Sequence, residues 1–147
     1  MAKAQHEAVV AVPLKVLYDT ILDFESYPKF STGVKSSEII SRKGDTLEVS
    51  MDLEMIKRIQ YNISVSHEMS PDASSAKIWW SLKSGDLFKK NDGAWTLTAH
   101  GPSSTKVTYS LDVEFNFSVP GFILKNLIKS SLPAAVSDFE KESQKRV

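Results

Sequence analysis

The chain has 147 residues, which is the length of one domain with one core, and we expect a single domain spanning 1–147. Lys plus Arg and Asp plus Glu both number 18, so the formal net charge is +0. This balance excludes the broad basic field of a DNA-binding protein. Cysteine is absent, which excludes disulfides, thiolate zinc sites and cysteine nucleophiles.

The first twelve residues form an apolar stretch that His6 and Glu7 interrupt. This stretch is too short and too polar for a secretory signal peptide, so the expected location is cytoplasmic. No run in the sequence reaches the ~18 apolar residues that a membrane-spanning helix needs.

The first elements in chain order are a strand over residues 7–12 and a short helix that begins at Pro13. Proline fits the first turn of a helix, and Leu14, Leu17 and Ile21 follow at helical spacing. A second short helical turn is expected within residues 23–30. The beginning of the chain is therefore a strand followed by two short helices.

In the middle of the chain, apolar and polar residues alternate with a period of two. Three long runs alternate apolar and polar residues, which is typical of antiparallel strands with one covered face, and shorter strands are expected between them. Turn-forming residues separate most of these runs, as in hairpins. The long runs are 47–55, 59–69 and 107–117, the shorter strands are 36–41, 77–83 and 94–99, and the turns are Gly44-Asp45, Pro71-Asp72, Ser84-Gly85, Asn91-Asp92-Gly93 and Gly101-Pro102-Ser103-Ser104.

The chain ends in a predicted long helix, Gly121–Lys145, with Ser118 as its N-cap and a kink at Pro133. At 1.5 Å per residue it is roughly 35 Å long, enough to cover the apolar face of the sheet. The sequence therefore predicts an α+β fold: about seven antiparallel strands, two short helices after the first strand, and one covering helix.

The apolar surface of this helix is unusually wide. It covers an arc of about 200°, whereas a surface helix typically has an apolar stripe of ~100°. Either the kink realigns the two halves, or the first half also faces a ligand, a membrane surface or a partner. Lys125 and Lys129 beside it are either a solvated edge or a contact for acidic lipid headgroups. The two apolar sectors are Ile123, Leu124, Leu127 and Ile128, then Leu132, Ala135, Val136 and Phe139.

The covered face of the sheet carries many ring-bearing side chains. They either fill the core or line an apolar cavity with a few polar groups, as in a small-molecule site. His67 is then either a hydrogen-bonded core residue, a polar anchor for a ligand, or an acid–base group. The rings on this face are Tyr61, His67, Trp80, Trp95, Tyr109, Phe115 and Phe117.

Motifs of other site types are missing from the sequence. It contains no phosphate-binding glycine loop, zinc-protease helix, calcium loop or nucleophile elbow. The three histidines, His6, His67 and His100, are far apart. We expect no metal, no cofactor and no dedicated catalytic residue.

Several segments nevertheless resemble one family. Asp23-Phe24-Glu25-Ser26-Tyr27-Pro28-Lys29-Phe30 is similar to the opening of the START-like (SRPBCC) superfamily, in its coenzyme Q-binding and polyketide cyclase branch. Further resemblance lies in 93–97, in 105–111 and in Val119-Pro120-Gly121-Phe122, so that it spans nearly the whole chain in order. After Phe30 the chain reads Ser31-Thr32-Gly33-Val34, which departs from the pattern of the quinone-binding and ribosome-association-toxin members.

The resemblance implies a helix-grip fold, in which a curved seven-stranded sheet wraps the long C-terminal helix around a hydrophobic cavity. It also implies lipid, isoprenoid quinone or polycyclic ligands. The leading hypothesis is therefore the binding or transport of a hydrophobic small molecule, with transient contact to a membrane surface. The residues expected to bind the ligand are Met51, Leu53, Tyr61, Ile63, Val65, His67, Ile78, Trp80, Trp95, Tyr109, Phe115, Phe122, Ile123, Leu127 and Ile128.

Two alternatives stay open. A polyketide cyclase or dehydratase would need convergent acid–base groups, for which the sequence offers only His67 and two tyrosines. A ribosome-associated regulator would need a local basic patch such as Lys35, Arg42, Lys43 and Lys57-Arg58, although the zero net charge argues against an RNA partner.

Overall fold

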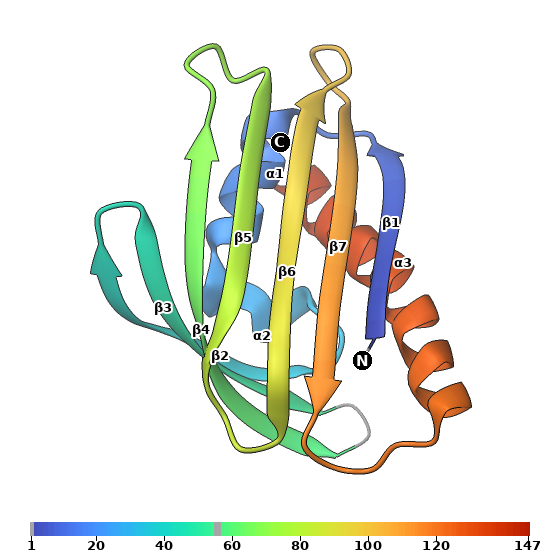
Figure 1. The fold of residues 1–147 in the computed structure, drawn as a ribbon. Helices are drawn as coiled ribbons and strands as arrows, with labels where there is room; N and C mark the ends of the chain where they lie inside the picture. The colour runs from blue at the N-terminus through green and yellow to red at the C-terminus, as the bar shows by residue number, and fades with distance from the viewer. Residues whose placement is uncertain (1, 55–56) are drawn as a thin grey trace.

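The computed structural model describes residues 2–54 and 57–147 (Figure 1). One strand and three short helical segments are followed by six strands and a long helix. The elements are β1 (Ala2–Val10), α1 (Leu14–Leu22), η1 (Phe24–Ser26), α2 (Tyr27–Phe30), β2 (Val34–Lys43), β3 (Thr46–Glu54), β4 (Arg58–Met69), β5 (Ser75–Ser84), β6 (Phe88–Ala99), β7 (Thr105–Phe115) and α3 (Gly121–Lys145).

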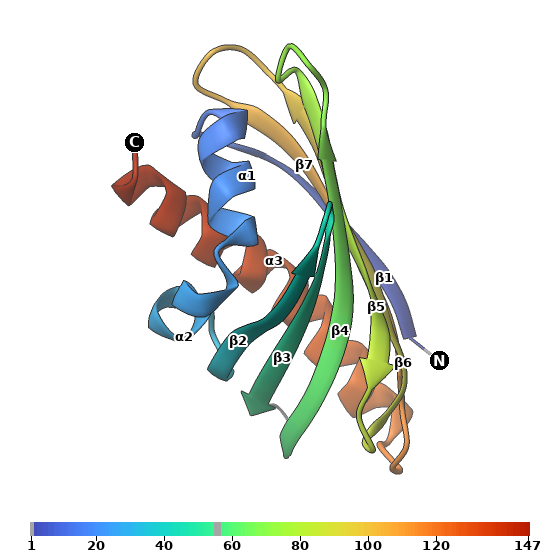
Figure 2. The same cartoon turned by 90° about the vertical axis from the view of Figure 1, so that its left-hand side faces the viewer.

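The strands form one antiparallel sheet with the order β1-β7-β6-β5-β4-β3-β2. Strands β2 to β7 follow one another as hairpins, and β1 pairs with β7. Figure 2 shows that the sheet is curved and that the helices lie on its concave side. The α+β fold with seven antiparallel strands and a covering C-terminal helix is confirmed.

The alternation of the sequence is visible in the burial of the strands. In β3 and β4 the side chains of Leu47, Val49, Ile63 and Val65 are buried. Cross-strand partners share a face, as in the pairs Leu47–Val65 and Val49–Ile63. The first strand starts earlier than predicted, at Ala2, because it pairs with β7 along its whole length.

Helix α3 spans the predicted residues, but its cap differs from the prediction. Pro120, not Ser118, is the N-cap, and its carbonyl accepts the N–H groups of Ile123 and Leu124. Pro133 lies inside the helix. Among the described residues, no helix is long and apolar enough to cross a lipid bilayer.

The two halves of α3 have different surroundings. Leu132, Val136 and Phe139 in the second half are buried against the sheet and α1. Phe122 and Ile123 in the first half are 71% and 41% exposed. One part of the wide apolar arc of α3 is therefore packed inside the protein, and another part is open to solvent.

The predicted turn at Asn91-Asp92-Gly93 is wrong, because these residues lie inside β6. Gly93 is paired with Trp80 of β5, and the indole ring occupies the space above the glycine. A Cβ added at Gly93 would lie 2.1 Å from Cζ2 of Trp80. Gly93 is thus a place where a large ring packs on the backbone.

Gly93→Ala should therefore destabilise the fold. We expect the free energy of unfolding to fall by about 1–3 kcal/mol, because Trp80 must leave its position. Urea denaturation measures this change. Gly121→Ala is the matched control, because a Cβ there meets no described atom within 4 Å, and its free energy of unfolding should stay the same or rise slightly. Equal values for the two variants would contradict the close packing of Trp80 on Gly93.

Candidate functional site

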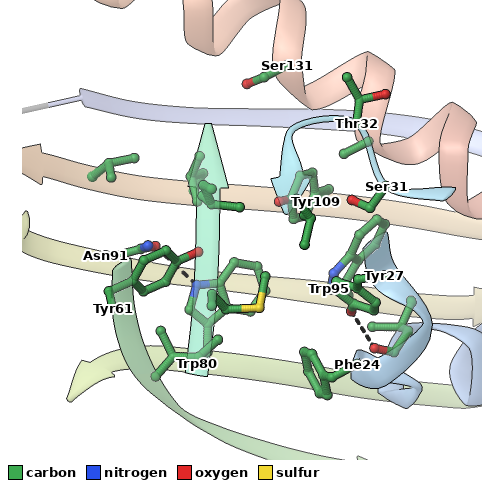
Figure 3. Close-up of a pocket in the computed structure, with 18 of the residues that line it drawn as sticks. Phe24, Tyr27, Ser31, Thr32, Tyr61, Trp80, Asn91, Trp95, Tyr109 and Ser131 are labelled. Carbon is green, nitrogen blue, oxygen red and sulfur yellow. Dashed lines mark hydrogen bonds between the residues drawn. The ribbon is translucent and has the colours of Figure 1, made fainter. Parts of the chain in front are cut away.

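A cavity of about 190 Å³ lies between the concave face of the sheet and the helices (Figure 3). Its wall combines side chains of α1, η1, α2, strands β2 to β7, and the second half of α3. It is lined by Ile21, Phe24, Tyr27, Ser31, Thr32, Val34, Met51, Leu53, Tyr61, Ile63, Ile78, Trp80, Phe88, Asn91, Trp95, Tyr109, Leu111, Val113, Phe115, Ser131, Ala135 and Phe139.

Nine of the fifteen residues expected to bind a ligand lie in this wall. All nine come from the inward faces of the strands, where the period of two placed them. They are Met51, Leu53, Tyr61, Ile63, Ile78, Trp80, Trp95, Tyr109 and Phe115. Whether they contact a ligand stays a prediction.

The other six residues are placed elsewhere or are not described. Val65 is fully buried in the core beside β3, outside the cavity wall. Phe122 and Ile123 lie on the exposed first half of α3. The side chains of Leu127 and Ile128 are outside the described part of the structure.

His67 makes a hydrogen bond away from the cavity. Its Nδ1 lies 2.7 Å from the hydroxyl oxygen of Tyr18 in α1, and the two rings meet edge to face. Burial, followed by the charges of Asp19, Asp45 and Glu68, raises the pKa of Tyr18. The hydrogen bond to Tyr18 matches the interpretation of His67 as a partnered structural residue.

A group of rings packs around Phe139, and most of them line the cavity. We call this group the Phe139 cluster (Tyr27, Phe30, Trp95, Tyr109 and Phe139). The ring of Phe139 lies 5.1 Å from the centroids of Tyr27, Phe30 and Trp95, in edge-to-face geometry. Trp95 stacks on Tyr109 at 4.2 Å. These contacts join α3, α2 and the sheet at the cavity wall.

A second group of rings, which we call the Phe88 cluster (Tyr61, Phe88, Phe115 and Phe117), packs farther along the same sheet. Phe88 packs edge to face with Tyr61 and stacks on Phe115. Phe115 in turn meets Phe117, over which the ammonium of Lys57 lies at 4.7 Å from the centroid. A cavity lined by several aromatic rings suits a flat apolar molecule.

The most deeply buried polar side chain of the wall is Asn91, which is 5% exposed. Its Oδ1 accepts a hydrogen bond from Nε1 of Trp80 at 3.2 Å. Because an indole nitrogen only donates, the carbonyl side of the amide must face Trp80. The orientation of Asn91 is thereby fixed.

Three tyrosine hydroxyls lie in the wall, and all three are protonated at neutral pH. Burial raises the pKa of Tyr109 to about 12 and also raises the pKa values of Tyr27 and Tyr61. The Tyr27 hydroxyl donates to the backbone carbonyl of Ile21. These groups are hydrogen-bonding partners and are poor bases at neutral pH.

In the described part of the wall, no side chain is suited to general base catalysis. Among the described residues that line the cavity, none has a carboxylate, imidazole, ammonium or guanidinium group. The described part of the chain likewise contains no cluster of side chains that could hold a metal ion. The arrangement can bind an uncharged molecule and can hydrogen-bond it through hydroxyl and amide groups.

Sequence reasoning missed thirteen wall residues, which come mainly from the helices and from β6 and β7. Asn91 and Trp95 are four residues apart in β6, so their side chains point to the same face of the sheet. Because Asn91 begins an Asn-Asp-Gly sequence, which is typical of a turn, the sequence analysis did not place it in a strand. Phe139 and Ala135 were on the apolar arc of the helix, and only the tilt of α3 decides that they face the cavity. Ser31 and Thr32 lie in the segment where the chain departs from the family pattern.

Comparison with known proteins supports the resemblance. The ribosome association toxin RatA of Pseudomonas aeruginosa is 23% identical over 128 residues, which cover 87% of this chain and 80% of the relative. A START superfamily protein from Mycobacterium smegmatis has a TM-score of 0.81 at 23% identity, with 99% of both chains covered. The ZhuI aromatase/cyclase from Streptomyces sp. R1128 has a TM-score of 0.82 at 12% identity, with 99% of this chain and 94% of that chain covered.

The similarity to these solved structures shows that the chain has the helix-grip fold. At sequence identities of 23% and 12% it does not show a shared function. The family is decided by a sequence model, described as "Polyketide cyclase / dehydrase and lipid transport", which matches residues 10–140. This match includes strands β2 to β7 and most of α3. The chain therefore belongs to the polyketide cyclase/dehydrase and lipid transport family.

Proposed function

We propose that this protein binds a hydrophobic small molecule in the cavity between the sheet and α3. The observation that carries the proposal is the chemistry of the wall, which is apolar and aromatic and, among the described residues, has no ionisable group other than tyrosine. A small-molecule site is typically apolar with a few oriented polar groups. The family description, which includes lipid transport, supports the same function.

The size of the cavity indicates how much of a ligand it encloses. An apolar cavity of about 150 Å³ accommodates benzene, so about 190 Å³ holds a ring-sized part of a molecule. A lipid or an isoprenoid quinone is larger than this. We expect such a ligand to require a movement of α3 away from the sheet.

Binding is better supported than catalysis. ZhuI is named as an aromatase/cyclase, and such an activity here would need an acid–base group beside the substrate. His67 is bonded to Tyr18 outside the cavity wall, and the wall tyrosines have raised pKa values. We therefore assign the cavity to binding.

Ribosome association is the other alternative, from the name of the toxin relative. Of the basic residues that could form an RNA-binding patch, Arg58 is paired with Asp52 and Lys35 with Glu54. These acidic partners weaken a positive field at that place. Co-sedimentation with ribosomes at low and moderate salt would discriminate this function from ligand binding.

The binding proposal can be tested by filling the cavity. Ala135→Phe places a ring inside it, so we expect the affinity for indane, an uncharged bicyclic hydrocarbon, to fall by about tenfold or more, as measured by isothermal titration calorimetry. Ala134→Phe is the matched control, because Ala134 is the exposed neighbour on the same helix, and it should bind indane like the wild type.

Thermal unfolding of both variants checks that the fold is kept, and Ala135→Leu is a milder version should Ala135→Phe unfold. The proposal is contradicted if the wild type does not bind indane, or if Ala135→Phe binds it as tightly as Ala134→Phe does.

We also propose that the first half of α3 contacts a membrane surface during ligand exchange. Phe122 and Ile123 are exposed there, and Lys125 and Lys129 are exposed beside them. From Phe115 to Ser137 the sequence contains no acidic residue. Exposed apolar side chains together with lysines are typical of helices that lie on anionic membranes.

A double variant tests this contact. Phe122→Ser with Ile123→Ser should reduce binding to vesicles of phosphatidylcholine mixed with phosphatidylglycerol by about tenfold, because apolar burial in the membrane is lost. Vesicle flotation measures the bound fraction. Ile40→Ser is the control, because it removes an exposed apolar side chain from β2, far along the chain from α3. Loss of binding in both variants, or in neither, would contradict a role for α3.

A further inference from the structure

A groove separate from the cavity lies between strand β1 and helix α3. Its volume is about 850 Å³, and it shares no lining residue with the cavity. Residues 3–6 of β1 line one side, and Leu124, Lys125 and Lys129 of α3 line the other. Figure 1 shows that the first half of α3 extends past the edge of the sheet at β1. The groove is therefore formed by a sheet edge and the helix beside it.

The side of the groove at β1 is the edge of the strand. Side chains of successive strand residues point to opposite faces of a sheet, so four consecutive residues border one groove along the strand edge. β1 is an edge strand, because it pairs only with β7. In an antiparallel pair, every second residue directs its N–H and C=O groups away from the partner. The groove is thus bordered by backbone groups of β1 that β7 does not use.

The two edges of the sheet differ in regularity. β1 pairs with β7 in one unbroken register along its nine residues. β2, at the other edge, has two register shifts against β3. Irregularities of this kind hinder the addition of a further strand, whereas a long and regular edge can accept one. β1 is therefore the edge that is suited to an added strand.

The groove is positively charged. Lys3, Lys125 and Lys129 line it together with His6, and none of its described lining residues has a carboxylate. The Nζ atom of Lys3 is 3.8 Å from Oδ2 of Asp112, beyond hydrogen-bond distance. Lys125 and Lys129 are exposed, and no carboxylate of the described structure forms an ion pair with them. The groove is therefore complementary to an acidic partner.

We propose that the groove binds an extended acidic segment of a partner protein, which pairs with β1 as an eighth strand of the sheet. Its backbone uses the free edge of β1, and its carboxylates lie beside Lys125 and Lys129. Alternate apolar side chains contact Leu124 and Leu132, which also line the groove. Adding a strand to a free sheet edge is a common way in which proteins bind peptides.

The backbone edge favours a peptide over a lipid, because a lipid headgroup cannot continue the ladder of the sheet. Phe122 and Ile123, which we assign to a membrane contact, do not line the groove. A second copy of this chain is a poor match, because its own β1 would bring Lys3 and His6 toward the lysines of α3. The proposal does not depend on what the cavity binds.

The test uses three fluorescein-labelled hexapeptides and measures binding by fluorescence anisotropy. The first is Val-Glu-Val-Glu-Val-Glu, the second has lysine in place of each glutamate, and the third is the acidic peptide with a methyl group on every backbone nitrogen. The third keeps the charges and loses the N–H donors that a strand needs. We expect the first peptide to bind about tenfold or more tightly than either of the others.

A pair of double variants places the site on the protein. Lys125→Gln with Lys129→Gln should weaken binding of the acidic peptide by about three- to tenfold, because two ion pairs are lost. Lys141→Gln with Lys145→Gln is the matched control. It makes the same change of charge at exposed lysines in the second half of α3, so the affinity should equal that of the wild type.

Amide hydrogen exchange, followed by NMR, is an independent readout of the added strand. With the acidic peptide bound, we expect slower exchange of amides within residues 3–6 of β1 and unchanged exchange in β2. The proposal is overturned if the methylated peptide binds as tightly as its parent, or if the slower exchange is in β2 instead.

The other occupants give distinct results. If the acidic peptide does not bind and dihexanoyl phosphatidylglycerol binds with the same dependence on Lys125 and Lys129, the groove is a lipid site. If the acidic peptide does not bind and sedimentation shows a dimer, a second copy occupies the edge. Either result overturns the proposal, and neither affects the binding of indane in the cavity.

Discussion

The packing of Phe139 on the rings of the sheet and of α2 is the interaction on which the rest of the structure depends. A curved sheet with one apolar face must be covered, and Leu132, Val136 and Phe139 in the second half of α3 are buried against it. Phe139 contacts Trp95 from β6 and Tyr27 from α2, so that one side chain joins three parts of the fold. The cavity is the space that this contact holds open between the sheet and the helix.

The fold was readable from the sequence because its elements have strong local signals. The alternation in β3 and β4 reflects one buried and one solvated face, as Val49 and Ile63 illustrate. The bounds of α3 were also correct, since Pro120 cannot continue a strand and suits the start of a helix. Each of these signals acts over a few residues and needs no knowledge of the partner element.

The site was readable only in part, because it depends on where elements meet. The alternation of apolar and polar residues predicted that His67 lies on the covered face of the sheet. It could not predict that the hydroxyl of Tyr18 in α1 would form a hydrogen bond with His67. Helical periodicity placed Ile123 on the apolar arc without showing that this side chain is 41% exposed. Asn91 was hidden because Asn-Asp-Gly favours a turn locally, whereas the packing of Trp80 on Gly93 favours a strand.

The same fold serves catalysts and carriers, and the wall chemistry distinguishes them here. An apolar wall with protonated tyrosines can bind and orient a ligand, but it supplies no general base for a reaction. Isoleucine-methyl NMR with indane tests this account most directly, because isoleucines lie both inside and outside the cavity. We predict intermolecular NOEs from indane to the methyl groups of Ile21, Ile63 and Ile78, and none to Ile40. NOEs to Ile123 or Ile40 without any to the three cavity isoleucines would contradict it.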